Sequence, residues 1–227
     1  MTEDILTSLG AQPSVSEERG LALLNDTDLV IFSPGISTGG FAEIRMAKSN
    51  PSRHIISTTI DDKGLSFAQE VIETSGVKNQ IDTKLEDLRD MNYPEDYFDF
   101  IYARLVLHYL SAQDLDAVLH RMYLSLKKNG RIFVVVRSIK NPNTNDPEYT
   151  YDPVTKLSRD VHRRADGSIE ATSVRYFHSP ESISEHLESA GFHIVAIEEY
   201  QERLYKDFMR KEISPNIDHL IEVVATK

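Results

Sequence analysis

Residues 29–49, LVIFSPGISTGGFAEIRMAKS, join a β-branched apolar run, a glycine-rich turn and a helical pattern without interruption. The same alternation continues downstream. Helical patterns lie at 64–75 and 112–126, and the apolar runs around them are 54–60, 81–85, 98–103 and 131–136. Strands that alternate with helices favour a parallel sheet covered by helices on both faces. The sequence therefore predicts an α/β fold of the Rossmann-like, doubly wound type.

The C-terminal part of the chain completes the predicted sheet. Apolar runs at 192–197 and 219–225 indicate two further strands, which brings the sheet to seven. We expect both strands at one edge, with the last strand antiparallel and the remaining sheet mostly parallel. The charged stretch between them, 202–211, predicts a short helix.

Two helix starts carry typical capping residues. Ser179 followed by Pro180 indicates an N-cap and a first-turn proline, and Gly191 is placed to end that helix. Earlier in the chain, we expect Asp62 to be the N-cap of a helix that begins at Lys63. These signals bound the helices that would connect the predicted strands.

Residues 138–178 break the alternation. They begin with a stretch rich in proline and asparagine, and Asp166-Gly167 then lies between two alternating segments, which predicts a β-hairpin. We interpret 138–178 as an inserted loop and hairpin lid above the carboxyl ends of the strands, where open α/β sheets bind ligands. We expect a single domain over residues 1–227, with residues 1–28 as an N-terminal helical cap.

The composition excludes several kinds of chemistry. The 227 residues include no cysteine, which excludes disulfide frameworks, thiolate metal sites and cysteine nucleophiles. The formal net charge is −11, and so acidic a surface disfavours a nucleic-acid partner. Because the sequence shows neither a signal peptide nor a long apolar run, we expect a cytoplasmic protein without a membrane partner. The oligomeric state stays open.

The glycine-rich turn admits three interpretations. A Walker loop requires a lysine where Phe41 stands, so that interpretation fails. The string from Gly35 to Gly39 also matches the nucleophile elbow of serine hydrolases, but that elbow follows several earlier strands. A dinucleotide fingerprint has glycine in place of Ser37, whose β-carbon crowds a diphosphate but leaves room for a smaller cationic ligand. Asp61, after the next strand, is positioned to bind a ribose diol.

Two later segments resemble a known family. Residues 84–110, KLEDLRDMNYPEDYFDFIYARLVLHYL, and 126–136, LKKNGRIFVVV, are similar to motifs of the class I S-adenosylmethionine-dependent methyltransferases that act on small molecules. The resemblance covers residues 29–136 at the level of motifs and extends more loosely to the last two strands. It implies S-adenosylmethionine as cofactor and methyl transfer to a small-molecule acceptor.

The resemblance also implies which residues hold the methionine and ribose parts of the cofactor. The turn that contains Gly35, Ser37 and Gly39 would pack against the methionine part, and Asp61 would bind the ribose hydroxyls. A carboxylate suits a diol because both hydroxyls are hydrogen-bond donors.

Further cofactor contacts implied by the resemblance lie after the third and fourth strands. Asp87 would accept a hydrogen bond from the adenine amino group, and the backbone amide of Leu88 would meet the ring. Ala103 and Arg104 would lie under the methionyl chain. The cofactor would thus cross the carboxyl ends of the first four strands.

Two positions depart from the family pattern. The family has an acid near the end of the first strand and a glycine two residues after the first glycine, where this chain has Ser33 and Ser37. Loss of the acid weakens the electrostatic attraction for a cationic cofactor unless another carboxylate substitutes for it. Two alternatives therefore stay open, a non-catalytic protein that binds S-adenosylmethionine or S-adenosylhomocysteine, and a nicotinamide-dependent oxidoreductase.

Candidate catalytic and substrate-binding residues also follow the strands. Methyl transfer from a sulfonium is an in-line displacement, and a base helps when the acceptor is a hydroxyl or an ammonium. His108 is the candidate base, and Arg104 can hold a carboxylate of the cofactor or the substrate. Because Arg104 stands where a catechol-type magnesium site needs an acid after the fourth strand, we expect no metal. The acceptor, an oxygen or nitrogen nucleophile that can be anionic, is expected to contact Tyr109, Arg137, Arg163 and Tyr176.

Overall fold

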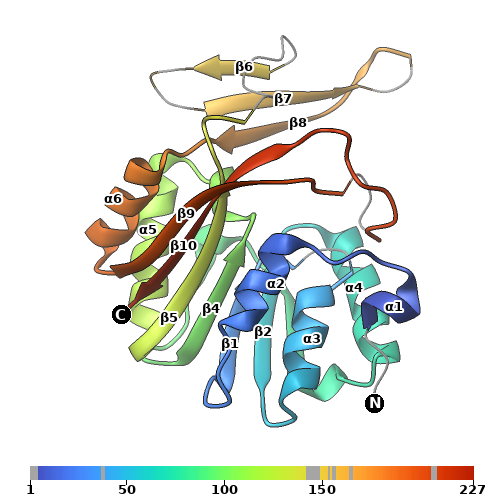
Figure 1. Cartoon of the computed structure of the whole chain (residues 1–227), viewed down its shortest axis with the longest axis vertical. Coiled ribbons are helices and arrows are strands. Elements are labelled where there is room, and N and C mark those ends of the chain that lie inside the picture. The colour runs from blue at the N-terminus through green and yellow to red at the C-terminus, as the bar shows by residue number, and fades with distance from the viewer. Residues whose placement is uncertain are drawn as a thin grey trace.

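The computed structural model describes residues 5–36, 39–141, 149–152, 154, 157–163, 166–205 and 209–227. Its centre is a seven-stranded sheet in the order β3-β2-β1-β4-β5-β10-β9 (Figure 1). The strands are β1 Val30–Pro34, β2 His54–Thr59, β3 Ile81–Leu85, β4 Phe98–Arg104, β5 Leu126–Arg137, β9 His193–Glu202 and β10 Asp218–Thr226. Strands β1 to β5 are parallel, and β10 is antiparallel to both β5 and β9. The predicted sheet is confirmed.

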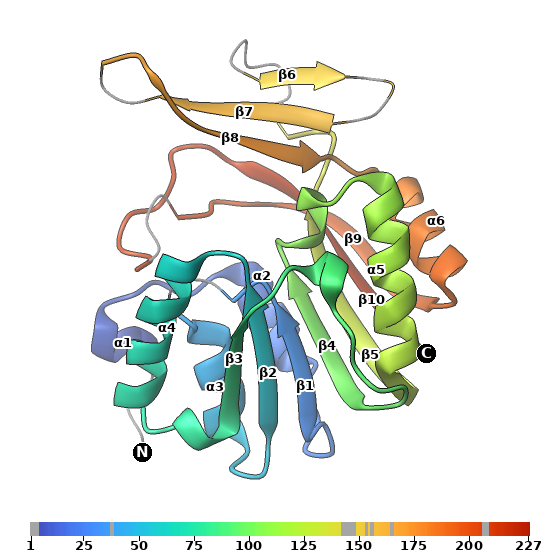
Figure 2. The same cartoon turned by 180° about the vertical axis from the view of Figure 1, so that it is seen from behind.

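Helices cover both faces of this sheet. They are α1 Ile5–Leu9, α2 Val15–Ala22, α3 Phe41–Ser49, α4 Asp62–Thr74, α5 Ala112–Ser125 and α6 Pro180–Ala190. Helices α2 and α3 lie toward the viewer in Figure 1, and α5 does so in Figure 2. Ile31 and Phe32 belong to different hydrophobic cores, one on each face, because successive strand residues point in opposite directions. Within the described ranges, none of these helices combines the length and apolar character needed to cross a membrane.

The predicted caps of α6 are confirmed. Ser179 Oγ accepts a hydrogen bond from the amide of Ser182, and Ser182 Oγ accepts one from the amide of Ser179. At the other end, Gly191 adopts φ +111°, and an added β-carbon would lie 2.8 Å from the ring of Tyr123. Only glycine fits both the conformation and the space at this helix end.

The predicted helix at 202–211 is wrong. Strand β9 continues to Glu202, which pairs with Asp218 of β10, and the residues of this stretch that the structure describes are not helical. The Glu202 carboxylate is buried and accepts hydrogen bonds from Ser14 Oγ at 2.6 Å and from the Ser16 amide at 3.2 Å. Strand pairing and these tertiary contacts override the weak helical preference of a charged stretch.

A second, three-stranded sheet lies over the carboxyl ends of the central strands (Figure 1). It consists of β6 Tyr149–Asp152, β7 Leu157–Arg163 and β8 Ile169–Tyr176. β7 and β8 pair in antiparallel fashion around Asp166-Gly167, which confirms the predicted hairpin. The backbones of Ser138 and His178 form a bridge that joins this sheet to the end of β5.

Candidate functional site

A cavity opens at the carboxyl ends of the first four strands. Its volume is about 410 Å³, within the range of about 300–1,000 Å³ that is usual for small-molecule sites. The chain leaves β1 and β4 toward opposite edges of the sheet, so the cavity lies at the topological switch point. Its lining includes the predicted site residues Gly35, Asp87, Leu88 and Tyr109.

The turn after β1 requires a glycine at its first position. Gly35 adopts φ +79°, and an added β-carbon would lie 2.8 Å from Val106 Cβ. The amides of Gly35 and Ile36 both donate to the carbonyl oxygen of Thr58 on β2, at 2.7 and 2.9 Å. The backbone of this turn is therefore held against β2 on one side and Val106 on the other.

The rest of the glycine-rich turn leads into α3. An added β-carbon at Gly39 would lie 2.2 Å from the ring of Phe41, the first residue of that helix. Ser37, the third residue expected to contact the cofactor in this turn, lies outside the described residues. Close packing of the ring explains why position 39 is a glycine.

Asp87 lies at the wall of the cavity and begins a short 3₁₀ helix, Leu88–Asp90. Its carboxylate accepts hydrogen bonds from the Arg89 amide at 2.9 Å and from the Arg89 guanidinium at 2.7 Å. These bonds lower the pKa of Asp87, although partial burial opposes the shift. Leu88 is buried beside it. An ionised acceptor and an apolar surface therefore stand next to each other at this wall.

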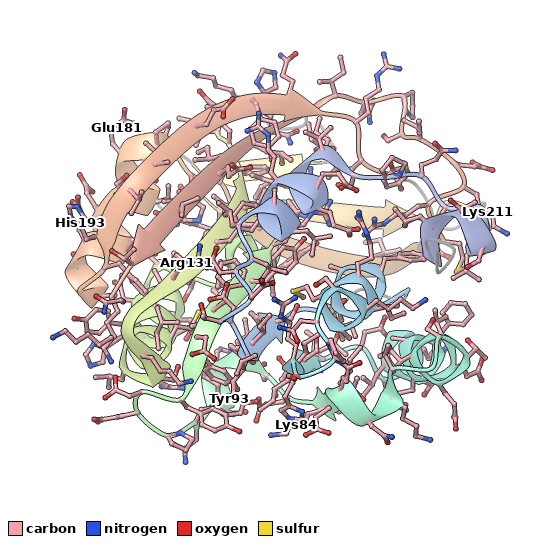
Figure 3. The ribbon with its side chains drawn as sticks, turned by 60° about the horizontal axis from the view of Figure 1, so that its bottom comes forward. Lys84, Tyr93, Arg131, Glu181, His193 and Lys211 are labelled. Atoms are coloured by element: carbon pink, nitrogen blue, oxygen red, sulfur yellow. The ribbon has the colours of Figure 1, made fainter. Side chains whose placement is uncertain are left out.

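A second carboxylate in the cavity wall, that of Glu86, was not predicted from the sequence. Tyr93 donates its hydroxyl to Glu86 at 2.8 Å, and burial, together with this bond, raises the pKa of Tyr93. Lys84 Nζ lies 4.9 Å from the Tyr93 ring, and the two residues lie side by side in Figure 3. Glu86 directly follows β3, so its position at a strand end was the available signal.

Asp61 occupies the N-cap position that the sequence assigned to Asp62. Helix α4 begins one residue earlier than predicted, so the N-cap assignment is wrong, and Asp62 is a first-turn acid that complements the helix dipole. In the described chain the Asp61 side chain makes no capping hydrogen bond. Asp61 is exposed next to Ile60, which lines the cavity.

Arg104 is held by the N-terminal segment. Its Nε donates to Ser16 Oγ at 2.7 Å, and its Nη2 donates to Ser14 Oγ at 2.6 Å. Arg104 lines a second, smaller pocket of about 20 Å³, which Gly35 also lines. The preceding residue, Ala103, is buried in the core of the sheet. The two residues expected under the methionyl chain thus have different surroundings.

A fully buried acid lines this smaller pocket and was not predicted. Ser33 donates its hydroxyl to Glu43 Oε1 at 2.6 Å. Burial raises the pKa of Glu43, and the bond from Ser33 opposes that shift. The Tyr102 hydroxyl, also buried in this pocket, finds no hydrogen-bond partner among the described residues. Glu43 lies on α3, so its carboxylate reaches the end of β1 from a different element.

The candidate base His108 lies on a 3₁₀ turn, Leu107–Tyr109, beside the cavity. Its side chain is buried, and its ring centroid lies 4.5 Å from that of the half-exposed Tyr109. Burial, and then Arg137, Arg175 and His178, lower the pKa of His108 well below its ordinary value. The imidazole is therefore neutral at neutral pH, and one of its ring nitrogens is a hydrogen-bond acceptor.

Two of the other predicted substrate residues, Arg137 and Tyr176, lie at the junction of the two sheets, whereas Arg163 lies at the far end of β7, next to the hairpin turn. Arg137, the last residue of β5, pairs with Asp218. Tyr176 is buried, with its ring centroid 4.5 Å from that of His178. Arg163 ends β7, and its side chain lies outside the described part of the structure. Over the described ranges, no group of three or more His, Cys, Asp or Glu residues is arranged to hold a metal ion.

Part of the chain matches a known protein family. Residues 31–130 match the model of a family described as "Methyltransferase domain". Over 143 residues the chain is 25% identical to the ubiquinone/menaquinone biosynthesis C-methyltransferase UbiE of Vibrio vulnificus, covering 61% of this chain and 54% of that protein. It is 24% identical over 196 residues to the phosphoethanolamine N-methyltransferase of Triticum aestivum, covering 84% of this chain and 34% of that protein.

A solved structure extends the similarity over nearly the whole chain. The structure of a SAM-dependent methyltransferase from Methanosarcina mazei superposes with a TM-score of 0.70 at 16% identity, covering 91% of this chain and 95% of the other. The chain spans about half the length of the UbiE relative. Residues 31–130 therefore match a methyltransferase domain family, and the chain shares the fold of the Methanosarcina mazei protein.

Proposed function

We propose that the protein transfers the methyl group of S-adenosylmethionine to an oxygen or nitrogen nucleophile of a small-molecule acceptor. The observation that carries this proposal is the cavity at the switch point, which Gly35, Asp87, Leu88 and Tyr109 line together. The first three match the family's cofactor positions, and Tyr109 adjoins the candidate base. One cavity can therefore serve both the cofactor and the acceptor.

The residues present fit an adenosyl group. The pKa of Asp87 is lowered, so its carboxylate is an ionised acceptor for an amino group, and the buried Leu88 offers an apolar surface to a purine. Asp61, whose side chain is not used to cap α4 in the described chain, is available for the hydroxyls of a ribose. These donor and acceptor chemistries complement an adenosine.

Glu43 supports the fit at the methionine end. The family's acid at the end of the first strand is replaced by Ser33, and the Ser33 hydroxyl donates to the buried Glu43. Burial raises the pKa of Glu43, which means that it disfavours the charged carboxylate. A nearby ammonium or sulfonium group would offset this effect by stabilising the negative charge. Arg104, in the same small pocket, can hold a carboxylate of the cofactor.

The chemistry we assign to the protein is orientation and proton removal. When bound, the cofactor supplies an activated methyl group. Tyr109 and Val106 shape the cavity beside Gly35, which positions the acceptor and excludes water. We assign proton removal to His108, whose neutral imidazole has a ring lone pair for the proton that an oxygen or nitrogen nucleophile loses.

Turnover assays test this function. The protein is incubated with S-adenosylmethionine and a panel of phenols, carboxylic acids, amines and phosphate esters, and formation of S-adenosylhomocysteine and of the methylated acceptor is measured. We expect turnover that falls about 10²–10⁴-fold in His108→Gln, while the exposed His120→Gln, on α5, retains activity. Binding of the cofactor without turnover on any acceptor would instead support the non-catalytic alternative.

A further inference from the structure

Two acids lie near the carboxyl ends of β2 and β3, and they differ in their relation to the cavity. Glu86, which directly follows β3, is partly buried and belongs to the lining. From the end of β2, the described residues that line the cavity are 58–60, and the exposed Asp61 lies outside this lining. A ligand that fills the cavity is therefore next to Glu86, whereas Asp61 is not part of the wall.

The backbone at Glu86 is fixed against the neighbouring strand. Its amide donates to the carbonyl oxygen of Thr59, the last residue of β2, at 2.9 Å. This bond continues the parallel pairing in which Thr59 lies opposite Leu85. Asp61 instead follows the strand as the N-cap of α4. The Glu86 side chain therefore leaves the sheet from a position that strand pairing determines.

One oxygen of the Glu86 carboxylate is anchored by Tyr93. The Tyr93 hydroxyl donates to Glu86 Oε2 at 2.8 Å, and the centroid of its ring lies 5.1 Å from those of both Phe32 and Phe98. Among the described residues, the other oxygen, Oε1, accepts no hydrogen bond. Because a side chain that is already held in place loses less conformational entropy on binding, the Tyr93 bond favours a ligand contact at this carboxylate.

The hydrogen-bonding capacity of Glu86 matches a pair of hydroxyls. A carboxylate offers about four lone-pair positions, and Tyr93 uses one of them. Both hydroxyls of a ribose are donors that can reach a single carboxylate. The neighbouring acid of the cavity, Asp87, already accepts from the amide and the guanidinium of Arg89. In the described structure, Glu86 therefore has more unused acceptor positions than Asp87.

We propose that Glu86 binds the two ribose hydroxyls of the cofactor and that Tyr93 positions its carboxylate for this contact. Asp61, the other acid near these strand ends, then makes no contact with the ribose. The inference rests on the proposed function, and it makes both hydroxyls a requirement for tight binding in the cavity.

Calorimetric titrations of the full chain with adenosine and with dideoxyadenosine, which lacks both ribose hydroxyls, test the assignment. Glu86→Gln should weaken adenosine about tenfold and leave dideoxyadenosine unchanged. The matched variant Asp61→Asn should leave both affinities unchanged. A loss of adenosine affinity in Asp61→Asn but not in Glu86→Gln overturns the assignment. Equal losses of both nucleosides in Glu86→Gln, with an unchanged thermal transition, overturn it as well.

A second variant tests the positioning role without removing a charge. Tyr93→Phe keeps the ring and removes only the hydroxyl, so it should weaken adenosine about threefold and leave dideoxyadenosine unchanged. The control Tyr97→Phe, whose ring also packs on Phe98, at 5.0 Å, should change neither affinity. Equal effects of the two variants overturn the role of Tyr93.

The same titrations separate this inference from the proposed function. If neither adenosine nor S-adenosylhomocysteine binds the original protein, the proposed function fails. If both bind, and dideoxyadenosine binds as tightly as adenosine, the proposed function stands and the assignment of Glu86 is overturned.

Discussion

The cavity and the small pocket, which meet at Gly35, shift the pKa values of their carboxylates in opposite directions. In the cavity, Asp87 is partly exposed and hydrogen-bonded to Arg89, which lowers its pKa. In the small pocket, Glu43 is fully buried, and burial raises its pKa. The environment of the cavity thus favours the charged form of its carboxylate, whereas burial in the small pocket disfavours the charged form of Glu43.

This difference indicates different roles for the two acids. An ionised, accessible carboxylate suits hydrogen-bond donors on a neutral group such as a purine. A buried carboxylate gains most from a ligand that carries positive charge, because little water is present to screen the attraction. A substitution in the turn that the two pockets share should therefore disturb the structure of both pockets. A substitution of Asp87 or Glu43 should change ligand binding in only one of them.

The largest effect is expected from Gly35→Ala. The added β-carbon would meet Val106 at 2.8 Å, and the positive φ is strained for any other residue. The control Gly76→Ala shares a positive φ but meets no atom within 4 Å. We expect the control to lower the free energy of unfolding by about 1 kcal/mol and Gly35→Ala by about 1–3 kcal/mol more, in urea denaturation. Equal losses would show that Val106 does not press on the turn.

Glu43→Gln should separate the two pockets in binding. The substitution keeps the size of the side chain but removes the charge, so affinity for S-adenosylmethionine should fall about tenfold. Adenosine lacks the amino acid part and should bind as it does to the original protein. Calorimetry with both ligands measures the difference. If the affinities for S-adenosylmethionine and for adenosine fall by the same factor, Glu43 affects the shape of the site and not the binding of the cationic end of the ligand.

The same variant should change how stability depends on pH. Because burial raises the pKa of Glu43 above its ordinary value of 4.5, the folded protein binds a proton there more tightly than the unfolded chain. This contribution to stability is present at low pH and is lost as pH rises through the folded pKa. Denaturation from pH 4 to pH 8 should therefore show Glu43→Gln gaining stability relative to the original protein. A constant difference would contradict the assignment.

The smallest effect is expected from Arg89→Gln. The ion pair with Asp87 is exposed, so its loss should change the free energy of unfolding by less than about 1 kcal/mol. Asp87 keeps the hydrogen bond from the amide of residue 89, so its carboxylate stays in place. We expect adenosine affinity to change less than about threefold in calorimetry. A larger loss would mean that the guanidinium itself contacts the ligand.

The fold followed from periodicity, whereas parts of the site did not. Alternating apolar runs and amphipathic stretches fix strands and helices because each must bury one side, and the turn at Gly35 could be located from the end of the first strand. Asp87 and Leu88, which line the cavity, were located only through the resemblance to the methyltransferases. Glu43 could not be located, because its side chain matters only once α3 packs on the end of β1. The stretch 202–211 was misjudged because strand pairing with β10 outweighs local preference.

The central claim is that the cavity at the ends of β1 to β4 binds the adenosyl cofactor through Asp87. Calorimetric titration with S-adenosylhomocysteine tests it most directly, with NAD as the competing ligand. We expect S-adenosylhomocysteine to bind, NAD not to bind, and Asp87→Ala to weaken the affinity about tenfold, while the exposed Asp90→Ala in the same 3₁₀ turn leaves it unchanged. Equal affinities of Asp87→Ala and Asp90→Ala, or no binding of S-adenosylhomocysteine at millimolar concentration, would contradict the account.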